Sequence, residues 1–471
     1  MVPYVSSSGN PRSRYVESTY FHSFCKAFIV CPEGYTRPKR SEDTDSVTET
    51  TKNGRGGETL LGSARVVVVG AGFAGGSFLR SLPPALRRPG ETLLVSREEE
   101  YVYTPLIHEV AVGRVHPDSV RTPIARDGAA PYTFLRAEAT EVDLRKKVLL
   151  TSSGPVKYDY LVLAPGSVAI PPPGRLLRYF QTFWSLSDAL RLRGSLNEAW
   201  RRALRGEQPP EGTTVILVGG GTTGVELAAE IAVLFDYLKK RTIRASTVEM
   251  HVVLLEETNR LMGWLDSYFH DAALKELSHL GVEVRLNTPV TAANEGGVDV
   301  SGEWLPAATR VWATGVQANP LLQGLPVEHD ARGRTRVSER LTLSEHPEVY
   351  ILGDGSVFEH PRLGPLPPTA SVAVQQGPWA ARDVGLRVRN VPEKKRRPFS
   401  FFDRGHVVSL GPERAIANPL GVKLKGRAAQ ALYRSILLYY MKRRRERLFT
   451  VADWAMEQTL GRLGFDLSSQ Q

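Results

Sequence analysis

The sequence predicts an α/β protein with two units of parallel sheet and a separate C-terminal region. Short apolar strands alternate with helical segments from residue 64 onward, which is typical of parallel strands covered by helices. A strand, a glycine-rich turn and a helix follow one another at 66–79 and again at 215–235. After residue 398 this alternation gives way to a basic, helix-prone segment. A chain of 471 residues is long enough for two or three such units.

The apolar runs locate the strands of these sheets. The expected strands are 65–69, 92–96, 147–151, 159–164, 214–218, 250–255, 282–285, 309–313 and 349–352. A short strand pair is expected in "FSFFDRGHVVSLG" at 399–411. The first 63 residues show no helical or strand period, and their mixture of Ser, Thr, Gly and both charges predicts a flexible tail.

The first glycine motif, "VVVVGAGFAGGSFL", has the spacing of a dinucleotide-binding turn. Gly70 allows the tight turn, Gly72 lets the backbone approach a pyrophosphate, and Gly75 lets the helix pack on the strand. The helix N-terminus then faces the anion. A glycine pattern alone is weak evidence, but its position between a strand and a helix favours dinucleotide binding over a purely structural turn.

The second motif, "VILVGGGTTGVELAAEIAVLF", repeats this arrangement with Gly219, Gly221 and Gly224. Its helix also carries Glu226 and Glu230, which share one face and repel mildly at that spacing. Either these acids are solvated or salt-bridged, or one is a carboxylate beside a bound cofactor or product.

The strand after the second motif ends at Glu256 in "MHVVLLEE", where a carboxylate can accept hydrogen bonds from both ribose hydroxyls. A carboxylate there would repel the extra phosphate of NADP and so favours NADH; Glu257 is the competing assignment. The matching strand end of the first unit has Ser96 where an acid is usual. We therefore expect two Rossmann-like domains for two dinucleotides that exchange a hydride, one of them a tightly held flavin.

Charge and cysteine usage narrow the class of protein further. The net charge is +10, and from Lys423 to Arg447 there are nine Lys or Arg and one acid, Glu446. This cluster lacks a nucleic-acid-binding module, so we expect no nucleic-acid partner. The only cysteines, Cys25 and Cys31, precede the first motif, which fits a reducing compartment and leaves no redox-active pair downstream. No stretch approaches the roughly 18 to 20 apolar residues that span a bilayer.

Seven segments occur in one order: "VVVVGAGFAG", "YVYTPLIHEVAVG", "YDYLVLAPGS", "VILVGGGTTGVELAAEI", "VWATGVQANP", "VYILGDGSVF" and "TASVAVQQG". In this ordered set the sequence resembles the type II NADH:quinone oxidoreductases, single-chain FAD enzymes that attach to a membrane surface. The resemblance runs from about Arg65 to the C-terminus. It implies a non-proton-pumping enzyme that passes a hydride from NADH to FAD and then two electrons to a quinone, without a metal.

The resemblance also assigns site residues. It places the FAD pyrophosphate on Gly70, Gly72 and Gly75, Asp354 near the flavin ribityl chain, and Thr104 and Pro105 along the isoalloxazine. It assigns NADH to Gly219, Gly221, Gly224 and Glu256, and places the catalytic Glu226 near the nicotinamide and flavin.

The quinone signature of the family departs from its usual form in this chain. The family has two glutamines in the pattern A-Q-x-A-x-Q, whereas this sequence has Ser371 at the first glutamine position and keeps Gln375. We expect quinone contacts from Ser371, Gln375 and Gln376, with Gln375 also catalytic. Ordinary polar packing is the alternative for Gln375, and the serine leaves the preferred quinone open.

The basic segment 427–449, "RAAQALYRSILLYYMKRRRERLF", predicts one helix about 35 Å long at about 1.5 Å per residue. Its apolar side and its charged band suit a helix that lies in a membrane interface. The alternative is an amphipathic helix packed on the protein's own sheet or on a twin subunit in a homodimer.

The expected domains are a tail at 1–63, an FAD domain at 64–178 and 333–398, an NADH domain at 179–332 inserted into it, and a membrane-association region at 399–471. We expect a peripheral protein on the cytoplasmic face of the inner (plasma) membrane, or on an organellar inner membrane. The alternatives are a soluble NADH oxidase or diaphorase and a non-catalytic NADH-sensing flavoprotein.

Overall fold

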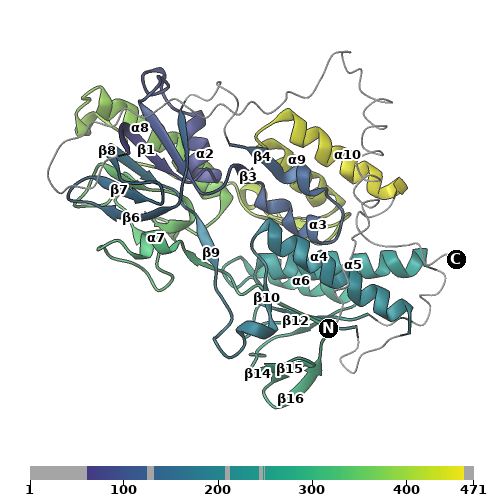
Figure 1. Ribbon diagram of the computed structural model, residues 1–471. Helices are drawn as coiled ribbons and strands as arrows, with labels where there is room; N and C mark the ends of the chain where they lie inside the picture. Colours follow the sequence, from purple (N-terminus) through teal and green to yellow (C-terminus); the bar gives the residue numbers. More distant parts are fainter. Residues whose placement is uncertain (1–60, 125–131, 207–212, 243–247, 249, 461–471) are drawn as a thin grey trace, which may run out of the picture. The chain divides into compact units, whose positions relative to one another are not determined.

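The computed structural model describes residues 61–124, 132–206, 213–242, 248 and 250–460 (Figure 1). Residues 1–60 of the predicted tail, with both cysteines, lie outside the described residues. All nine strands predicted from the apolar runs are present, and the α/β fold class is confirmed. The predicted domain boundaries stay predictions.

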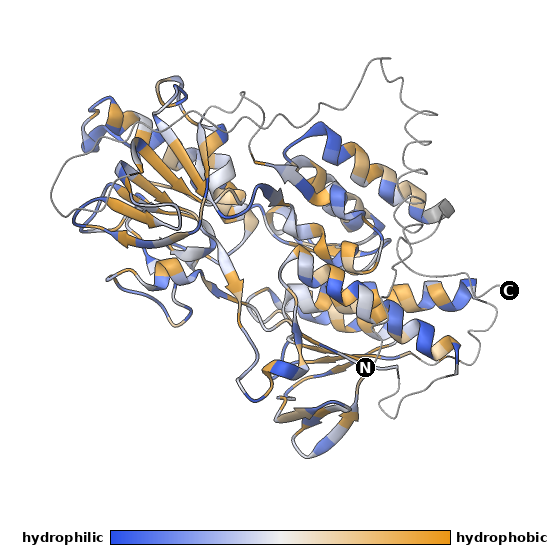
Figure 2. Cartoon of the chain, in the orientation of Figure 1, coloured by the Kyte–Doolittle hydropathy of each residue, from blue (hydrophilic) through white to orange (hydrophobic). Residues whose placement is uncertain are grey.

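The first sheet has seven strands and positions the first glycine motif. Its order is β5-β2-β1-β8-β7-β6, and β20 pairs with β8 on a separate branch. The parallel strands are β5 (Thr133–Arg136), β2 (Thr92–Ser96), β1 (Gly62–Val69), β8 (Val156–Leu163) and β20 (Val349–Ile351); β7 (Val148–Thr151) and β6 (Ala139–Asp143) run antiparallel. Val66 to Val69 are all buried, as expected for a parallel strand covered on both faces, and the strands of this sheet are largely hydrophobic (Figure 2).

Helices α2 (Phe73–Arg80) and α8 (Ala370–Val388) pack against each other beside this sheet. Because β20 and α8 come from the last third of the chain, the chain returns to the first sheet after it has built the second.

The second sheet positions the second glycine motif. Its five strands are all parallel, in the order β10 (Gln181–Thr182), β17 (Thr309–Trp312), β11 (Val215–Val218), β12 (Val252–Leu255) and β13 (Val282–Arg285). Helices α4 (Leu186–Leu204), α5 (Thr222–Arg241) and α6 (Ser267–His279) belong to this unit. Helix α4 begins with a capping box in which Ser185 and Asp188 bond each other's backbone amides.

Smaller elements complete the described fold. The strand pair predicted at 399–411 is instead one strand of a three-stranded antiparallel sheet, β24 (Val407–Ser409), β25 (Ala415–Ala417) and β26 (Leu424–Gly426). The remaining helices and paired strands are α3 (Ile107–Ala111), α7 (Pro320–Gln323), β3 (Glu100–Val102), β4 (Arg121–Pro123), β9 (Ser167–Ala169), β18 (Val316–Ala318), β14 (Ala292–Asn294), β15 (Gly297–Val300), β16 (Glu303–Pro306), β19 (Thr335–Arg336), β21 (Ser356–Val357), β22 (Glu359–His360) and β23 (Gly364–Pro365).

The single helix predicted at 427–449 is wrong. Helix α9 (Arg427–Tyr440) ends where Met441 adopts an extended conformation, and α10 (Arg444–Leu460) starts anew. The break has a physical cause, because Lys442 turns into the protein and its Nζ donates to the carbonyl of Ala71 at 3.0 Å. The Arg447 guanidinium donates to the carbonyl of Met441 at 2.8 Å, and so supplies a hydrogen-bond donor to the backbone at the C-terminal end of α9.

Part of the apolar side of this segment packs on the protein itself. Tyr433, Leu437 and Trp454 are buried in the same hydrophobic cluster as the inner face of α5, and α9 contacts β25 and β26. None of the helices in the described residues has the length and apolar character that crossing a bilayer requires.

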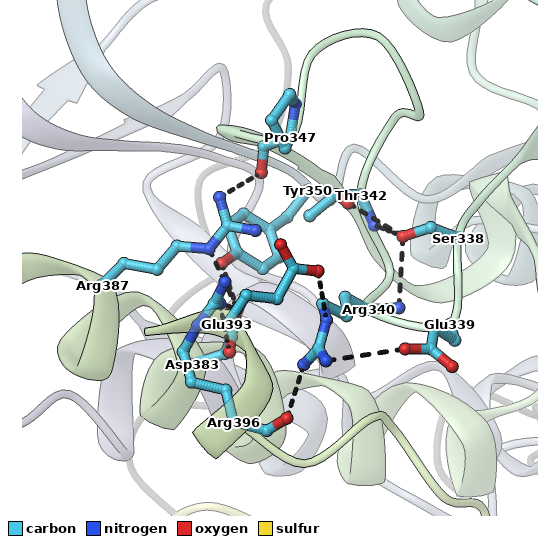
Figure 3. A network of polar contacts seen from close by, with 10 residues as sticks. All are labelled: Ser338, Glu339, Arg340, Thr342, Pro347, Tyr350, Asp383, Arg387, Glu393 and Arg396. Atoms are coloured by element: carbon cyan, nitrogen blue, oxygen red, sulfur yellow. Dashed lines mark hydrogen bonds and ion pairs between the residues drawn. The ribbon is translucent and has the colours of Figure 1, made fainter. Parts of the chain in front are cut away.

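A buried charge network ties the end of α8 to the first sheet (Figure 3). The carboxylate of Asp383 accepts hydrogen bonds from the Tyr350 hydroxyl at 2.6 Å, from Arg396 at 2.7 Å and from Arg387 at 3.2 Å. Arg340 joins the same region through the Arg396 carbonyl at 2.9 Å. These bonds hold α8 against β20.

Candidate functional site

A cavity of about 730 Å³ opens at the carboxyl ends of the parallel strands of the first sheet. Residues that follow β1, β8 and β20 line it, namely Gly70, Ala164 and Gly353, and Ser96 lines it from the end of β2. Ligands of doubly wound sheets bind at this edge, and the volume falls within the usual range of about 300 to 1,000 Å³.

The glycines of the first motif divide into two roles. A Cβ on Gly70 would lie 2.3 Å from the carbonyl oxygen of Ala164, and Gly70 has a φ of +91° that disfavours other residues. A Cβ on Gly75 would lie 2.0 Å from the carbonyl oxygen of Gly70. Gly72, in contrast, faces open space in the cavity wall. The turn therefore needs Gly70 and Gly75 for packing and leaves Gly72 facing the open cavity, an arrangement that fits dinucleotide binding.

The second motif repeats this geometry. Gly219 has a φ of +112°, and its Cβ would lie 2.5 Å from the carbonyl oxygen of Ala313. A Cβ on Gly224 would lie 1.9 Å from the carbonyl oxygen of Gly219, whereas Gly221 has open space. The two loops thus have the same construction on two separate sheets.

Glu256 sits beside the second loop, at the end of β12. Its Oε2 accepts a hydrogen bond from the Gly220 amide at 2.6 Å, and its Oε1 accepts from the amide and hydroxyl of Thr258 at 2.8 and 2.7 Å. The carboxylate is therefore fixed at the edge of the loop, where a ribose would lie. The ribose assignment itself stays a prediction.

Asp354 lies in the cavity wall directly after β20. Its Oδ2 accepts a hydrogen bond from the Ser167 hydroxyl at 2.6 Å, and burial raises the pKa of its carboxyl above the ordinary value. Ser167 was missed by the sequence analysis, although it ends the quoted segment "YDYLVLAPGS". Ser96 and Thr104 also line the cavity; Pro105 follows Thr104 in a short 3-10 helix and does not line it.

The two acids of α5 have different partners. Oε1 of Glu226 accepts a hydrogen bond from the Ser409 amide at 3.1 Å, and burial raises the pKa of this carboxyl. Glu230 is fully buried and pairs with Arg114, a residue that the sequence analysis missed. Local patterns contain no signal for this pair because its members are 116 positions apart.

Arg114 is the centre of a buried cluster that joins three segments of the chain. Besides Glu230, its guanidinium lies 2.9 Å from Glu457 of α10 and 3.8 Å from Glu109 of α3. The Trp454 indole donates to Glu109 at 2.7 Å. Burial alone would lower the pKa of Arg114, but the three carboxylates outweigh it and raise the pKa. The repulsion noted between Glu226 and Glu230 is therefore compensated by a cation from elsewhere in the sequence.

Among the described residues, one cluster has the spacing of metal ligands: His108, Glu109 and Glu230 lie with their ligand atoms within 4.8 Å of one another. The Arg114 guanidinium already contacts both carboxylates and so occupies the place of a cation. The donor set is therefore that of a buried ion-pair cluster.

The predicted quinone residues Gln375 and Gln376 differ in the hydrogen bonds that their side chains make within the protein. Gln376 is fully buried, with Oε1 accepting from the Gly353 amide at 2.6 Å and Nε2 donating to the Ser356 hydroxyl at 3.1 Å, so its role here is to hold the turn after β20. This placement argues against quinone contact by Gln376. Nε2 of Gln375 donates to the carbonyls of Ser371 and Phe402, each at 3.1 Å. Both of its amide hydrogens are thus engaged.

Two sheets built around parallel strands, each with a dinucleotide-type glycine loop, define a protein with two dinucleotide-binding units. The chain belongs to the pyridine nucleotide-disulphide oxidoreductase family, which residues 64–377 match.

Curated relatives and solved structures agree with this. The chain is 26% identical over 412 residues to the type II NADH:quinone oxidoreductase of Mycobacterium tuberculosis, covering 83% of this chain and 87% of that one. It is 29% identical over 379 residues to the type II NADH:quinone oxidoreductase of Staphylococcus aureus, covering 78% and 92%.

Among solved structures, the chain is similar to NDH2 of Plasmodium falciparum in complex with NADH. The TM-score is 0.74 and the identity 17%, and the match covers 84% of this chain and 98% of that one. It is also similar to the sulfide:quinone oxidoreductase of Aquifex aeolicus, with a TM-score of 0.65 and 18% identity. This match covers 84% of this chain and 96% of that one. At these identities the structural matches establish the fold alone.

Proposed function

We propose that this chain is a non-proton-pumping type II NADH:quinone oxidoreductase that works with FAD at a membrane surface. The observation that carries the proposal is the pair of glycine loops with identical construction on two sheets. The names of the curated relatives give the donor and the acceptor, NADH and quinone. Both cysteines of the chain precede the first loop, so residues 64–377 contain no cysteine pair that could form a redox-active disulfide. Electrons would therefore pass from the flavin to the acceptor directly.

FAD would be held in the cavity of the first sheet. Gly72 lets its pyrophosphate approach the N-terminus of α2, and Asp354 accepts hydrogen bonds from the ribityl chain. When bound, the flavin supplies a hydride acceptor and a two-electron donor. Thr104 and Ser96 shape the wall around it.

NADH would be held by the second loop. Gly221 faces its pyrophosphate, and Glu256 accepts hydrogen bonds from the ribose hydroxyls and repels the extra phosphate of NADPH. Glu226, on the helix that follows the loop, would lie near the nicotinamide. Because burial raises its pKa, this carboxyl holds a proton to higher pH than an exposed glutamate does.

The quinone would approach at the start of α8. Ala370 and Ala373 line the flavin cavity, and Ser371 lies between them in the first turn of this helix. A quinone carbonyl needs a hydrogen-bond donor, and the Ser371 hydroxyl can supply one where the family has glutamine. Gln375 keeps an acceptor lone pair on Oε1 for the quinol hydroxyl. The acceptor is dissolved in lipid, so the enzyme attaches peripherally to the membrane that contains it.

Anaerobic stopped-flow absorbance tests this function in two steps. The purified, FAD-loaded protein is reduced with stoichiometric NADH and then mixed with ubiquinone or menaquinone analogues in separate runs. We expect NADH to bleach the flavin and at least one quinone to restore it rapidly and saturably. Bleaching without restoration would contradict the acceptor and favour an NADH oxidase or diaphorase, while NADH binding with negligible turnover on every acceptor would favour a sensor.

A further inference from the structure

A buried cluster of ionisable side chains adjoins Glu226. His108 and Glu109 of α3 and Glu230 of α5 are buried, whereas Glu226 is half-buried. One polar atom from each of the three buried side chains lies within 4.8 Å of the other two. Both Glu109 and Glu230 are close enough to Glu226 to act on its carboxyl electrostatically. Glu226 is therefore the member of this group that a ligand or solvent reaches most easily.

His108 stands between Glu226 and the buried acids. Its Nε2 is hydrogen bonded to the Tyr433 hydroxyl of α9 at 3.4 Å. Burial raises the pKa of the Glu226 carboxyl, and the strongest opposing influence is the charge that the His108 ring can carry. Histidine is the side chain that most readily gains and loses a proton near neutral pH. The ring is thus placed to exchange a proton with the carboxyl next to it.

The carboxyls around His108 outnumber the cations. Five carboxyls and two guanidinium groups from α5, α9, α10 and the α3 segment meet here, namely Glu109, Glu226, Glu230, Asp453, Glu457, Arg114 and Arg434. The exposed His116 also faces Asp453. Because unbalanced buried charge is costly, the excess of carboxyls favours bound protons. The cluster is therefore a place where exchangeable protons are held.

Several buried polar atoms of this region have no hydrogen-bond partner within the described residues. They are Oε1 of Glu109, Nη2 of Arg114, and both Oε1 and Nε2 of Gln430. Gln430 is buried one turn before Tyr433 on α9. Buried polar atoms without a protein partner normally bind internal water. Such water can carry a proton across spacings that are too long for direct transfer between side chains.

The cluster approaches the surface at α10. Nε of Arg114 donates to Glu457 at 2.9 Å, and Nη1 of the same guanidinium contacts Glu230. The side chain of Glu457 is 12% exposed, whereas those of Arg114 and Glu230 are fully buried. Arginine keeps its proton in proteins, so Arg114 holds the two carboxylates together and carries no proton itself. Glu457 and Glu226 are thus the outer and inner ends of one chain of titratable groups.

The proposed reaction needs a proton that NADH does not supply. NADH gives up two electrons and one proton as a hydride, whereas a quinone takes up two electrons and two protons to become a quinol. The second proton comes from water. We propose that His108 relays this proton from the Glu457 side of the cluster to Glu226, which gives it up to the reaction and is protonated again through His108. This inference rests on the proposed function and adds a route for the proton to it.

Stopped-flow absorbance of the full-length, FAD-loaded protein tests the relay with three substitutions. His108→Gln keeps a hydrogen-bonding partner for Tyr433 but cannot titrate, and Glu457→Gln keeps an acceptor for Arg114 but removes the outer acid. The control is His279→Gln, which changes an exposed histidine at the end of α6. Flavin reduction by NADH and flavin reoxidation by a short-chain quinone are each followed over a range of pH, in ordinary and in heavy water.

We expect flavin reduction at saturating NADH to be unchanged in every variant, because hydride transfer takes up no proton from the protein. Reoxidation by quinone should slow roughly tenfold or more in His108→Gln. The loss should grow as the pH rises, with a larger solvent isotope effect, and Glu457→Gln should show the same pattern. Added imidazole should restore part of the rate in His108→Ala, in proportion to the concentration of imidazolium. His279→Gln should behave like the natural protein.

Reoxidation at the natural rate in His108→Gln would overturn the relay and leave the proposed function standing. So would equal slowing of both half-reactions without rescue by imidazole, because His108 would then only support the fold. If the His108 variants fail to retain FAD, the pH profile and isotope effect of Glu457→Gln decide. Failure of the natural, NADH-reduced protein to react with any quinone would refute the proposed function and the relay with it.

Discussion

The side chain of Gln375 binds the main chain of Phe402 on both sides. Its Nε2 donates to the Phe402 carbonyl at 3.1 Å, and its Oε1 accepts from the Phe402 amide at 3.0 Å. Helix α8, whose first turn borders the cavity of the first sheet, is thereby joined to an exposed segment that lies outside the two sheets. The side chain of the residue expected to contact quinone is thus engaged with the main chain of this segment.

Replacement of Gln375 by Leu should separate the two half-reactions. The variant loses the two bonds to Phe402, each worth about 0.5–1.5 kcal/mol, so the segment loosens at the quinone approach. In stopped-flow absorbance we expect slower flavin reoxidation by quinone and an unchanged rate of flavin reduction by NADH. Gln375→Glu keeps the acceptor for the Phe402 amide and should lie between the two. Slowing of both steps by the same factor would contradict this assignment.

Glu256→Gln should weaken the discrimination between NADH and NADPH. The glutamine keeps the size of the side chain but removes the charge that repels the extra phosphate, so the ratio of kcat/KM values should fall by roughly tenfold, or about 1.4 kcal/mol. The matched control is Glu257→Gln, the competing assignment. If the Glu257 variant alone changes the ratio, the ribose carboxylate is Glu257.

The two kinds of glycine in the first motif should respond differently to alanine. Gly75→Ala places a Cβ against the Gly70 carbonyl and should lower the free energy of unfolding by about 1–3 kcal/mol. Gly72→Ala meets open space and should leave the melting temperature of the FAD-free protein unchanged while the purified protein retains less FAD. Equal effects of the two substitutions on stability would contradict the division of roles.

Arg114→Met should be among the more destabilising single substitutions. It leaves the fully buried Glu109 and Glu230 without their shared cation, at a cost of about 3–5 kcal/mol in chemical denaturation. The double variant Arg114→Met/Glu230→Gln should recover part of the loss because one of the carboxylates is then neutral. Strictly additive losses would show that the two residues do not act as a pair.

Lys442 predicts a specific dependence of stability on pH. Burial, with help from Arg80 and Arg443, lowers the pKa of Lys442 well below the ordinary value. The unfolded chain therefore binds more protons than the folded chain between the lowered pKa and about 10.4, and stability rises with pH across this window. Lys442→Met should remove this rise. Urea denaturation at neutral and alkaline pH measures it, with the exposed Lys157→Met as the control.

The sequence was sufficient for features that local patterns encode. Gly70, Gly219 and Glu256 each follow directly on a run of apolar residues that marks a strand, so the sequence alone locates them. The close approach of the Ala164 and Ala313 carbonyls, which requires the two glycines, is visible only in the structure. Each prediction needed a strand, a turn and a helix in succession, so each could be made without knowledge of distant contacts.

Features that depend on distant contacts could not be predicted. Arg114 pairs with Glu230, and Lys442 bonds to Ala71 across 371 positions. The break at Met441 follows from that last bond, since the amphipathic period of 427–449 continues through it. Gln375 and Gln376 were both expected beside a quinone, but the helix turns the two side chains toward different partners.

The contacts that Lys442 and α10 make with residues 71–114 also bear on biosynthesis. Glu457, Trp454 and Lys442 are made last, yet they bond to Arg114, Glu109 and Ala71, which belong to the first-made unit. A nascent chain whose final thirty or so residues are still held by the ribosome therefore has the buried Arg114 and Glu109 without two of their native partners. We expect this part of the fold to become stable only after release of the completed chain.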